Sequence, residues 1–264
     1  MGENKNFTAQ IIHRQQVSDK LVKALNILIN ADFAAPELKF IKGDKGHEVY
    51  KWCFQGQIYF IKNYAYRRWS KRIKNYLRRP RAFKVVKYHK RLTQAGVATA
   101  PIRLALDYSP AFFSNKSLVL SKKVKGQDLE KYLNENQERE KRRQALESLS
   151  RAIHSLYVNK VILGDPSLHN YFYQPQEAKM ILLDLDNLRQ YPFLPEYLFY
   201  RSLAKLLALT SARKMKFSLA EQRFFLENIL SLMGKNKEAQ SNILKKIYRL
   251  TNKRLKKWGK AEMF

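Results

Sequence analysis

Residues 163–170 read Leu163-Gly164-Asp165-Pro166-Ser167-Leu168-His169-Asn170, and a second aspartate, Asp184, closes an apolar run that begins at Met180. This stretch combines two carboxylates with one amide. Carboxylate and amide oxygens suit a hard divalent cation such as Mg²⁺, and a further carboxylate can orient or deprotonate a hydroxyl group. A plain turn is the alternative interpretation, because Asp-Pro-Ser favours turn initiation and Asn170 can cap such a turn.

The residues upstream favour the catalytic interpretation over the turn. Apolar side chains recur there at helical spacing: Leu146, Leu149, Ile153, Leu156 and Tyr157. A short apolar strand, residues 161–163, follows them. A helix, a loop with Asp-x₄-Asn and a strand ending in aspartate follow one another in this order in the large lobe of kinase-type folds. There, Asp165 would orient or deprotonate the acceptor hydroxyl. Asn170 and Asp184 would hold the Mg²⁺ that bridges the phosphates of ATP.

The preceding part of the chain predicts a small β-rich lobe. A strand leads into a loop that contains Gly43 and Gly46, and a hairpin with a Gln55-Gly56 turn ends in Lys62. In a kinase-type small lobe the backbone N–H groups of such a loop cover the phosphates, and the strand lysine reaches the α- and β-phosphates. Gly43-x-x-Gly46 is equally typical of an ordinary turn. Lys62 is therefore nominated by its place at the end of a strand.

A connector links the two halves. The strand ending at Ser121 leads through a glycine-containing segment to a helix that starts with Asp128-Leu129. The order resembles the hinge that receives adenine; Asp128 is a candidate ligand of the ribose, and capping of the helix is an alternative.

We therefore predict an α+β, two-lobed protein-kinase-like fold, one domain over residues 1–264. Its small β-rich N-lobe covers about 36–121, its hinge about 122–127 and its mainly helical C-lobe about 128–264.

Composition limits the possible classes. A chain of 264 residues with 45% hydrophobic residues is long enough for a domain with its own core. No apolar stretch reaches the roughly 18 residues of a membrane span, and the first residues lack the basic-then-apolar pattern of a signal peptide. Cys53 is the single cysteine, which excludes an internal disulfide, and we expect it in the core. These features favour a cytoplasmic protein.

The charge is strongly positive. Lys and Arg number 51 against 22 Asp and Glu, a net charge of +29, and no acid occurs between Glu48 and Asp107. Two basic stretches with aromatic residues stand out, 67–79 and 245–258. Such a balance predicts a polyanionic partner: nucleic acid, an anionic membrane face or an acidic glycolipid. Trp69 and Trp258 are candidate membrane anchors, with a place in the core as the alternative.

Several pieces of the chain together resemble the bacterial lipopolysaccharide core kinases, closest to the heptose-phosphorylating type. The resembling segments, all within about residues 40–205, are 60–62, 92–96, 126–129, 164–172 and 181–185. The resemblance implies a cytoplasmic enzyme, peripheral to the inner membrane, that phosphorylates an inner-core sugar from Mg-ATP. It also implies the roles given above for Lys62, Asp165, Asn170 and Asp184. Nucleic acid is then not an expected partner.

One departure leaves alternatives open. Kinases pair the strand lysine with a helix glutamate, but no acid lies between Glu48 and Asp107, so Lys62 needs another counter-charge, for which Asp184 is a candidate. The segment after Asp184 is too short for a peptide-docking platform, which favours a small molecule or sugar as acceptor. The rival functions are a phosphotransferase acting on an aminoglycoside or choline, and a catalytically dead kinase fold that binds a polyanion. An acidic cleft suits cationic substrates, so the charge disfavours the first.

Overall fold

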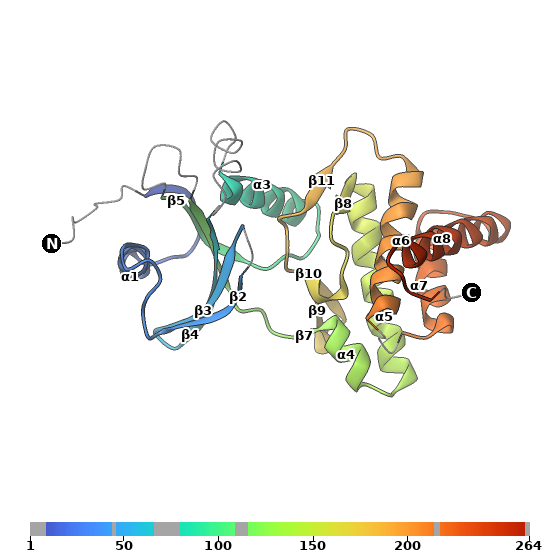
Figure 1. Cartoon of the computed structure of the whole chain (residues 1–264), viewed down its shortest axis with the longest axis horizontal. Coiled ribbons are helices and arrows are strands. Elements are labelled where there is room, and N and C mark those ends of the chain that lie inside the picture. The colour runs from blue at the N-terminus through green and yellow to red at the C-terminus, as the bar shows by residue number, and fades with distance from the viewer. Residues whose placement is uncertain (1–8, 44–45, 66–79, 109–115, 214–216, 262–264) are drawn as a thin grey trace. The chain divides into compact units, whose positions relative to one another are not determined.

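The structure of the chain is a computed structural model, which describes residues 9–43, 46–65, 80–108, 116–213 and 217–261 (Figure 1). The chain forms two compact units, Met1–Lys90 with Ala100–Val124 and Arg91–Thr99 with Lys125–Phe264. The passage from Val124 to Lys125 lies within the connector predicted at 122–127; its action as a hinge stays a prediction. Within the described ranges, no helix is both long and apolar enough to cross a membrane.

The first unit contains a six-stranded antiparallel sheet with the order β1-β5-β6-β4-β3-β2. Its strands are β1 (Gln10–Arg14), β2 (Leu38–Gly43), β3 (Glu48–Phe54), β4 (Gln57–Tyr64), β5 (Ile102–Asp107) and β6 (Ser117–Lys122). Gln55 and Gly56 join β3 to β4 with φ of 49° and 73°. Two positive φ values in a two-residue loop match the right-handed twist of the strands, so the predicted hairpin is confirmed. β1 was not predicted.

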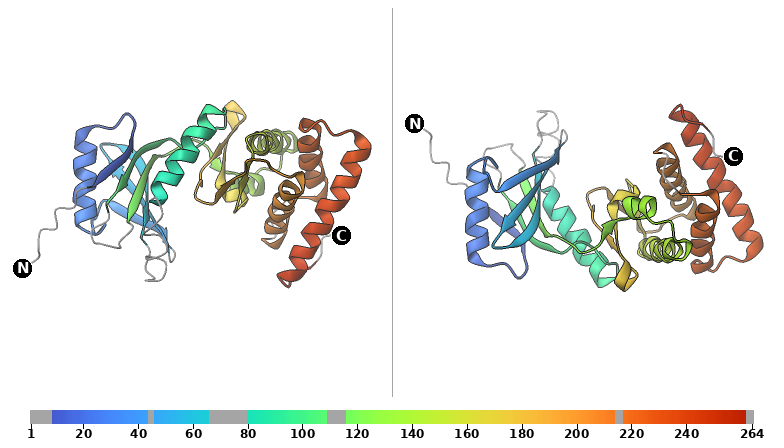
Figure 2. Two further views of the ribbon diagram at one scale, coloured as in Figure 1. Left: turned by 90° about the horizontal axis from the view of Figure 1, so that it is seen from above. Right: turned by 90° about the horizontal axis from the view of Figure 1, so that it is seen from below.

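Helix α1 (Asp19–Asn30) covers one face of this sheet (Figure 2). Ser18 caps it, its hydroxyl accepting from the N–H of Leu21. The buried stripe of α1 packs with alternate residues of the central strands in one core: Leu21, Leu25, Leu28, Ile29, Ile61, Leu118 and Leu120. Each fully buried Leu or Ile stabilises the fold by about 2 kcal/mol. The core of the unit therefore lies between α1 and the sheet.

The opposite sheet face carries Lys62 and meets α3 (Arg81–Gln94). The N–H of Ala82, at the start of α3, donates to the hydroxyl of Ser117 on β6 at 3.3 Å. Cys53 of β3 is exposed, so its expected place in the core is wrong. The reason is register: Cys53 alternates with the buried Trp52 and so points away from the α1 side. The basic stretch 67–79, with Trp69, lies outside the described residues.

The second unit is mainly helical. Its helices are α4 (Leu129–Glu135), α5 (Arg139–Val158), α6 (Glu196–Ala212), α7 (Leu219–Leu232) and α8 (Lys237–Lys257). Two small sheets, with the orders β10-β9-β7 and β11-β8, complete it. Their strands are β7 (Gln127–Asp128), β8 (Val161–Leu163), β9 (Tyr171–Gln174), β10 (Lys179–Leu182) and β11 (Leu188–Gln190). Strands β7, β9 and β11 were not predicted, because each is too short to show a period.

A nearly buried ion pair fastens α5 to α7. Arg142 Nε and Nη2 donate to the two carboxylate oxygens of Glu221 at 2.5 and 2.9 Å. Burial would raise the pKa of Glu221, but hydrogen bonds from Arg142 and Ser218 hold it below its ordinary value. Glu221 is also the third residue of α7 and closes a capping box with Ser218. One carboxylate thus begins α7 and joins it to α5.

Candidate active site

The loop between β8 and β9 carries Asp165 and Asn170. Asp165 is exposed just after β8, and Asn170 ends the short 3₁₀ helix η1 (Leu168–Asn170). The Asn170 side-chain amide donates to the backbone carbonyl of Asp165 at 2.8 Å. This bond closes the loop on itself, and it directs the Nδ2 group of Asn170 at the Asp165 carbonyl. The two residues that the sequence pairs by spacing are therefore neighbours in the fold.

Strand pairing brings Asp184 to the same place. β9 and β10 are antiparallel, with Tyr171 opposite Leu182. The residues just outside the strands continue the pairing, since the N–H of Leu183 donates to the carbonyl of Asn170 at 2.9 Å. Asp184 follows Leu183 directly, and its Oδ1 accepts from the N–H of Asp186 at 3.0 Å. The hairpin thus sets Asn170 and Asp184 at one end of the same two strands.

A second backbone contact joins the two loops. The N–H of Gly164 donates to the carbonyl of Asn187 at 2.8 Å, next to the β8–β11 pair of Leu163 and Leu188. A Cβ placed on Gly164 would lie 2.6 Å from that carbonyl oxygen. Only glycine permits this approach without a shift of the backbone. The Lys205 ammonium of α6 also donates to the carbonyl of Gly164, so the start of the loop is held from two sides.

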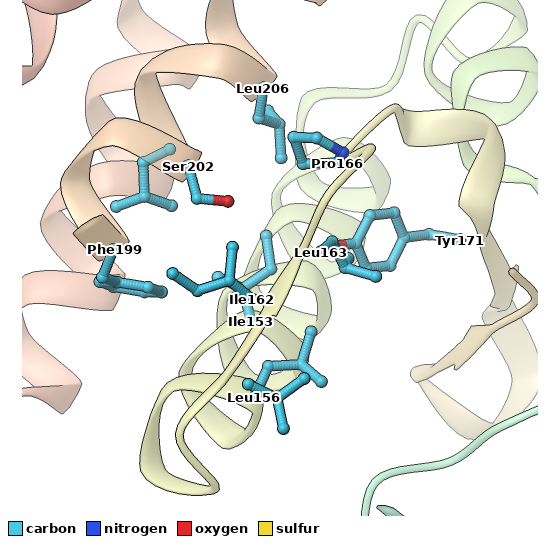
Figure 3. A pocket seen from close by; sticks show the side chains of 11 residues that line it. Ile153, Leu156, Ile162, Leu163, Pro166, Tyr171, Phe199, Ser202 and Leu206 are labelled. Carbon is cyan, nitrogen blue, oxygen red and sulfur yellow. The ribbon is translucent and has the colours of Figure 1, made fainter. Parts of the chain in front are cut away.

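An apolar cavity lies beneath the loop, between β8, α5 and α6 (Figure 3). Pro166 and Tyr171 line it together with Leu156, Phe199 and Ser202. The Tyr171 hydroxyl is buried without a hydrogen-bond partner among the described residues. Burial, reinforced by the charge of Asp165, raises the pKa of Tyr171 well above its ordinary value. Apolar side chains and the neutral phenol of Tyr171 therefore pack beneath the loop.

A polar cluster beside the loop was not predicted. His169, directly before Asn170, contacts two carboxylates: its Nδ1 lies 3.1 Å from Asp128 Oδ2 and its Nε2 lies 2.9 Å from Glu130 Oε2. Arg213, at the end of α6, contacts Glu130 at 3.2 Å and donates to the hydroxyl of Ser167 at 2.8 Å. His169 could have been found from its position in the 165–170 loop. Nothing in the sequence indicated a role for Arg213.

Asp128 has two roles in the structure. It is the N-cap of α4, where its Oδ1 accepts from the N–H of Lys131 at 3.1 Å, and its Oδ2 faces His169. The capping alternative is therefore what the structure shows. Contact of Asp128 with a ribose stays a prediction. Through His169, this cap connects the start of α4 with the loop of Asp165 and Asn170.

The residues predicted to contact the phosphates lie in the first unit. Lys62 is on β4, paired with Val49 of β3 and Val119 of β6, and its Nζ lies 5.8 Å from the centre of the Tyr64 ring. Gly43 ends β2 and Gly46 lies in the loop that leads to β3, as expected. Asp165, Asn170 and Asp184 lie in the second unit. Their action together with Lys62 in one site belongs to the proposed function.

The oxygen donors of the second unit fit a magnesium ion. Proteins hold Mg²⁺ through one or two carboxylates, with phosphate and water oxygens as the other ligands. Asp184 supplies a carboxylate, and the hydrogen bond from Asn170 Nδ2 to Asp165 leaves the Asn170 carbonyl oxygen as its side-chain acceptor. Among the described residues, no group of three or more His, Cys, Asp or Glu side chains is gathered as a metal site.

Sequence comparison identifies the family. Residues 31–207 match the lipopolysaccharide kinase (Kdo/WaaP) family over most of the chain. The chain belongs to this family. No curated protein matches the chain in sequence. Family membership agrees with the resemblance drawn from Lys62, Gly164-Asp165-Pro166, Asn170 and Asp184.

Solved structures confirm the protein-kinase-like fold. WaaP in complex with acyl carrier protein is similar with a TM-score of 0.56 at 16% identity, covering 80% of this chain and 88% of that one. Aminoglycoside phosphotransferase APH(2'')-Ib with bound ADP gives 0.52 at 10% identity, covering 88% and 86%. A putative aminoglycoside phosphotransferase from Ralstonia eutropha gives 0.50 at 11%, covering 87% and 85%. Identities this low establish the fold alone.

Proposed function

We propose that this protein transfers the γ-phosphate of ATP to a hydroxyl group of an inner-core heptose, or a related core sugar, of lipopolysaccharide. One observation carries the proposal: hydrogen bonds join Asn170 to the backbone of Asp165 and to Leu183, the residue before Asp184, at one end of the β9–β10 hairpin. Membership of the lipopolysaccharide kinase family supports the acceptor class. The proposal places this reaction at the cytoplasmic face of the inner membrane, with the enzyme as a peripheral protein.

In this mechanism Asp165, Asn170 and Asp184 of the second unit each have a defined role. Asp165 is exposed at the start of the loop, where it orients the acceptor hydroxyl and takes its proton. Asn170 and Asp184 would hold Mg²⁺, which would supply charge neutralisation at the transferred phosphoryl group. The hydrogen bonds Asn170–Asp165 and Leu183–Asn170 keep these groups in register before the substrates arrive. Such preorganisation is the main contribution of a protein to phosphoryl transfer.

The first unit supplies the contacts to the phosphates of the nucleotide. Lys62 projects from β4 on the face opposite α1, and we assign backbone N–H groups at Gly43 and Gly46 to the phosphates. Helix α3, which stands where kinases carry a glutamate, has the sequence RAFKVVKYHKRLTQ and holds no acid. We therefore assign Asp184 as the counter-charge of Lys62 in the complex with Mg-ATP.

A panel of acceptors tests the proposal. The purified protein is incubated with γ-labelled ATP and, separately, with dephosphorylated lipopolysaccharide, an aminoglycoside and choline. Label in the core oligosaccharide, mapped to one heptose hydroxyl by NMR after delipidation, supports the assignment. Label in the aminoglycoside or choline alone would assign the protein to the small-molecule phosphotransferases. No label together with no thermal shift from ATP would show a kinase fold without catalysis.

A further inference from the structure

Helix α8 presents a continuous cationic face. From Asn242 to its end the helix contains no acid, and six exposed cations lie on the side opposite its buried stripe: Lys245, Lys246, Arg249, Lys253, Lys256 and Lys257. The buried stripe, which includes Leu244, Ile247 and Leu255, faces α6 and α7. Figure 2 shows α8 on the outer side of these two helices within the second unit. The cationic face, as we name these six residues, is therefore turned to solvent.

The cations of this face differ from those elsewhere in the unit. On α5 and α7, exposed cations are paired along the helix, as in Arg143–Glu147 and Arg223–Glu227. Across the described part of the chain, no salt bridge involves any of the six cations of the face. Lys246 lies near two aromatic rings, its Nζ 5.3 Å from the centre of the Tyr197 ring and 5.9 Å from that of Tyr200. Lys246 also interacts electrostatically with Glu196 of α6, whereas the described residues place no salt bridge on the other five cations.

This arrangement lowers the stability of the isolated helix. Lys245, Arg249, Lys253 and Lys257 follow one another at intervals of four, so like charges are neighbours on the surface three times in succession. Each such pair destabilises a helix by about 0.2–0.5 kcal/mol. Three cations in the last turn interact favourably with the helix dipole, but the rest gain nothing from it. A bound polyanion would reverse the sign of the whole electrostatic contribution.

Aromatic side chains border the face. Trp258 is the C-cap of α8 and is 38% exposed, which excludes a fully buried role. Tyr197 of α6 is 46% exposed and lies between Lys246 and Arg201, at 5.3 and 5.6 Å from the two cations. Aromatic side chains beside lysine and arginine on a surface helix are typical of segments that lie in a lipid headgroup layer. The length of α8, about 30 Å, gives a straight and shallow contact surface.

We propose that the cationic face of α8 docks the protein on a bilayer that contains anionic phospholipid. The choice of a bilayer rests on the proposed function, because a lipopolysaccharide acceptor is embedded in a membrane. Lysine and arginine near such a surface contribute additively to binding, and six of them exceed what reversible association requires. Trp258 enters the headgroup region at one end of the face. The helix then holds the protein where its acceptor is.

Vesicle sedimentation of the full-length protein tests the docking surface. The vesicles contain about one third phosphatidylglycerol in phosphatidylcholine, a composition with a strongly negative surface potential. The test variant combines Lys245→Gln, Arg249→Gln and Lys253→Gln. The control combines Lys20→Gln, Lys23→Gln and Lys39→Gln, which removes the same charge at exposed positions of the first unit. We expect binding of the test variant to fall about a hundredfold, and binding of the control to fall less than tenfold.

Three results would overturn the docking proposal. They are equal losses in the two variants, binding of wild type to pure phosphatidylcholine vesicles, and tighter binding to single-stranded RNA than to anionic vesicles with the same α8 dependence. Phosphorylation of a delipidated core oligosaccharide separates this question from the proposed function. We expect the α8 variant to retain that activity. A protein that binds vesicles through α8 but phosphorylates no sugar would keep the docking surface and refute the proposed reaction.

Discussion

The backbone N–H of Gly164 donates a 2.8 Å hydrogen bond to the carbonyl of Asn187, so the residue before Asp165 is fixed to the loop that follows Asp184. An added Cβ at Gly164 would come within 2.6 Å of the same oxygen. This close approach couples the acceptor side of the proposed site to its metal side. A small change at Gly164 should therefore displace both aspartates.

Gly164→Ala is expected to lower kcat at least tenfold, because the clash with Asn187 separates the loops that carry Asp165 and Asp184. The cost in stability should be about 1–3 kcal/mol, as for other overpacked sites. Gly234→Ala is the matched control, since Gly234 has a φ of 73° but open space around a Cβ. It should lose about 1 kcal/mol of stability and keep full kcat. Equal kcat in both variants would contradict the coupling of the loops.

Substitutions at Asp128 separate its cap from a contact with the nucleotide. Asn is as good an N-cap as Asp, whereas Ala removes the cap at a cost of about 1 kcal/mol. Asp128→Ala should therefore lower the melting temperature and Asp128→Asn should not. If Asp128 reaches the ribose as predicted, both variants raise the KM for ATP; if it acts only as a cap and on His169, neither does.

The Arg142–Glu221 pair should make the stability of the fold depend on pH in the acid range. The pKa of Glu221 is lower in the folded than in the unfolded protein. The contribution of the ionised Glu221 to the stability of the fold is therefore complete above the ordinary glutamate pKa of 4.5. It is lost as the pH falls through the pKa of Glu221 in the folded protein. Glu221→Gln should flatten this acid limb of a plot of melting temperature against pH. An unchanged limb would show that the pair carries no acid-linked stability.

Arg142→Ala should destabilise the fold by about 3–4 kcal/mol at neutral pH, because it leaves the Glu221 carboxylate partly buried without its partner. The same substitution also removes the donor to the carbonyls of Leu133 and Asn136, at the end of α4. Urea denaturation measures the loss. Arg143→Ala, which breaks an exposed pair on the same helix, is the control and should cost less than about 1 kcal/mol.

Lys62→Met should raise the KM for ATP and lower kcat more than tenfold if this lysine contacts the phosphates. The substitution keeps an unbranched side chain on β4, so the sheet should remain intact. Lys39→Met, on the exposed edge strand β2, is the control for loss of one charge and should change neither constant. A Lys62 variant with wild-type constants would remove this residue from the nucleotide site.

Long periodic segments were predicted correctly from the sequence, and short or contact-dependent features were not. The helix that carries Leu146, Leu149 and Ile153 and the hairpin turn at Gln55-Gly56 follow from apolar spacing and turn chemistry, which are local. β1 and β7 pair with strands far away in the sequence, β5 and β9, so their few residues carry no pattern of their own. Cys53 was misplaced because an apolar residue type does not reveal which sheet face it occupies.

The site shows the same division. Asp165, Asn170 and Asp184 could be nominated because the spacing of their residues along the chain reflects a loop and a hairpin. The contacts of His169 with Asp128 and Glu130 join residues about forty positions apart, and those of Arg213 span still more. Such contacts depend on how α4 and the end of α6 pack beside the loop. No local pattern in one sequence encodes that packing.

Transfer of labelled γ-phosphate from Mg-ATP to dephosphorylated lipopolysaccharide, measured for wild type beside Asp184→Asn, tests the central claim most directly. The substitution keeps the size of the side chain and removes the carboxylate that would hold the metal. We expect label in the core oligosaccharide with wild type, and a loss of at least a hundredfold with the variant at unchanged melting temperature. Equal label with both proteins would contradict the role of Asp184 and the phosphoryl-transfer centre built on it.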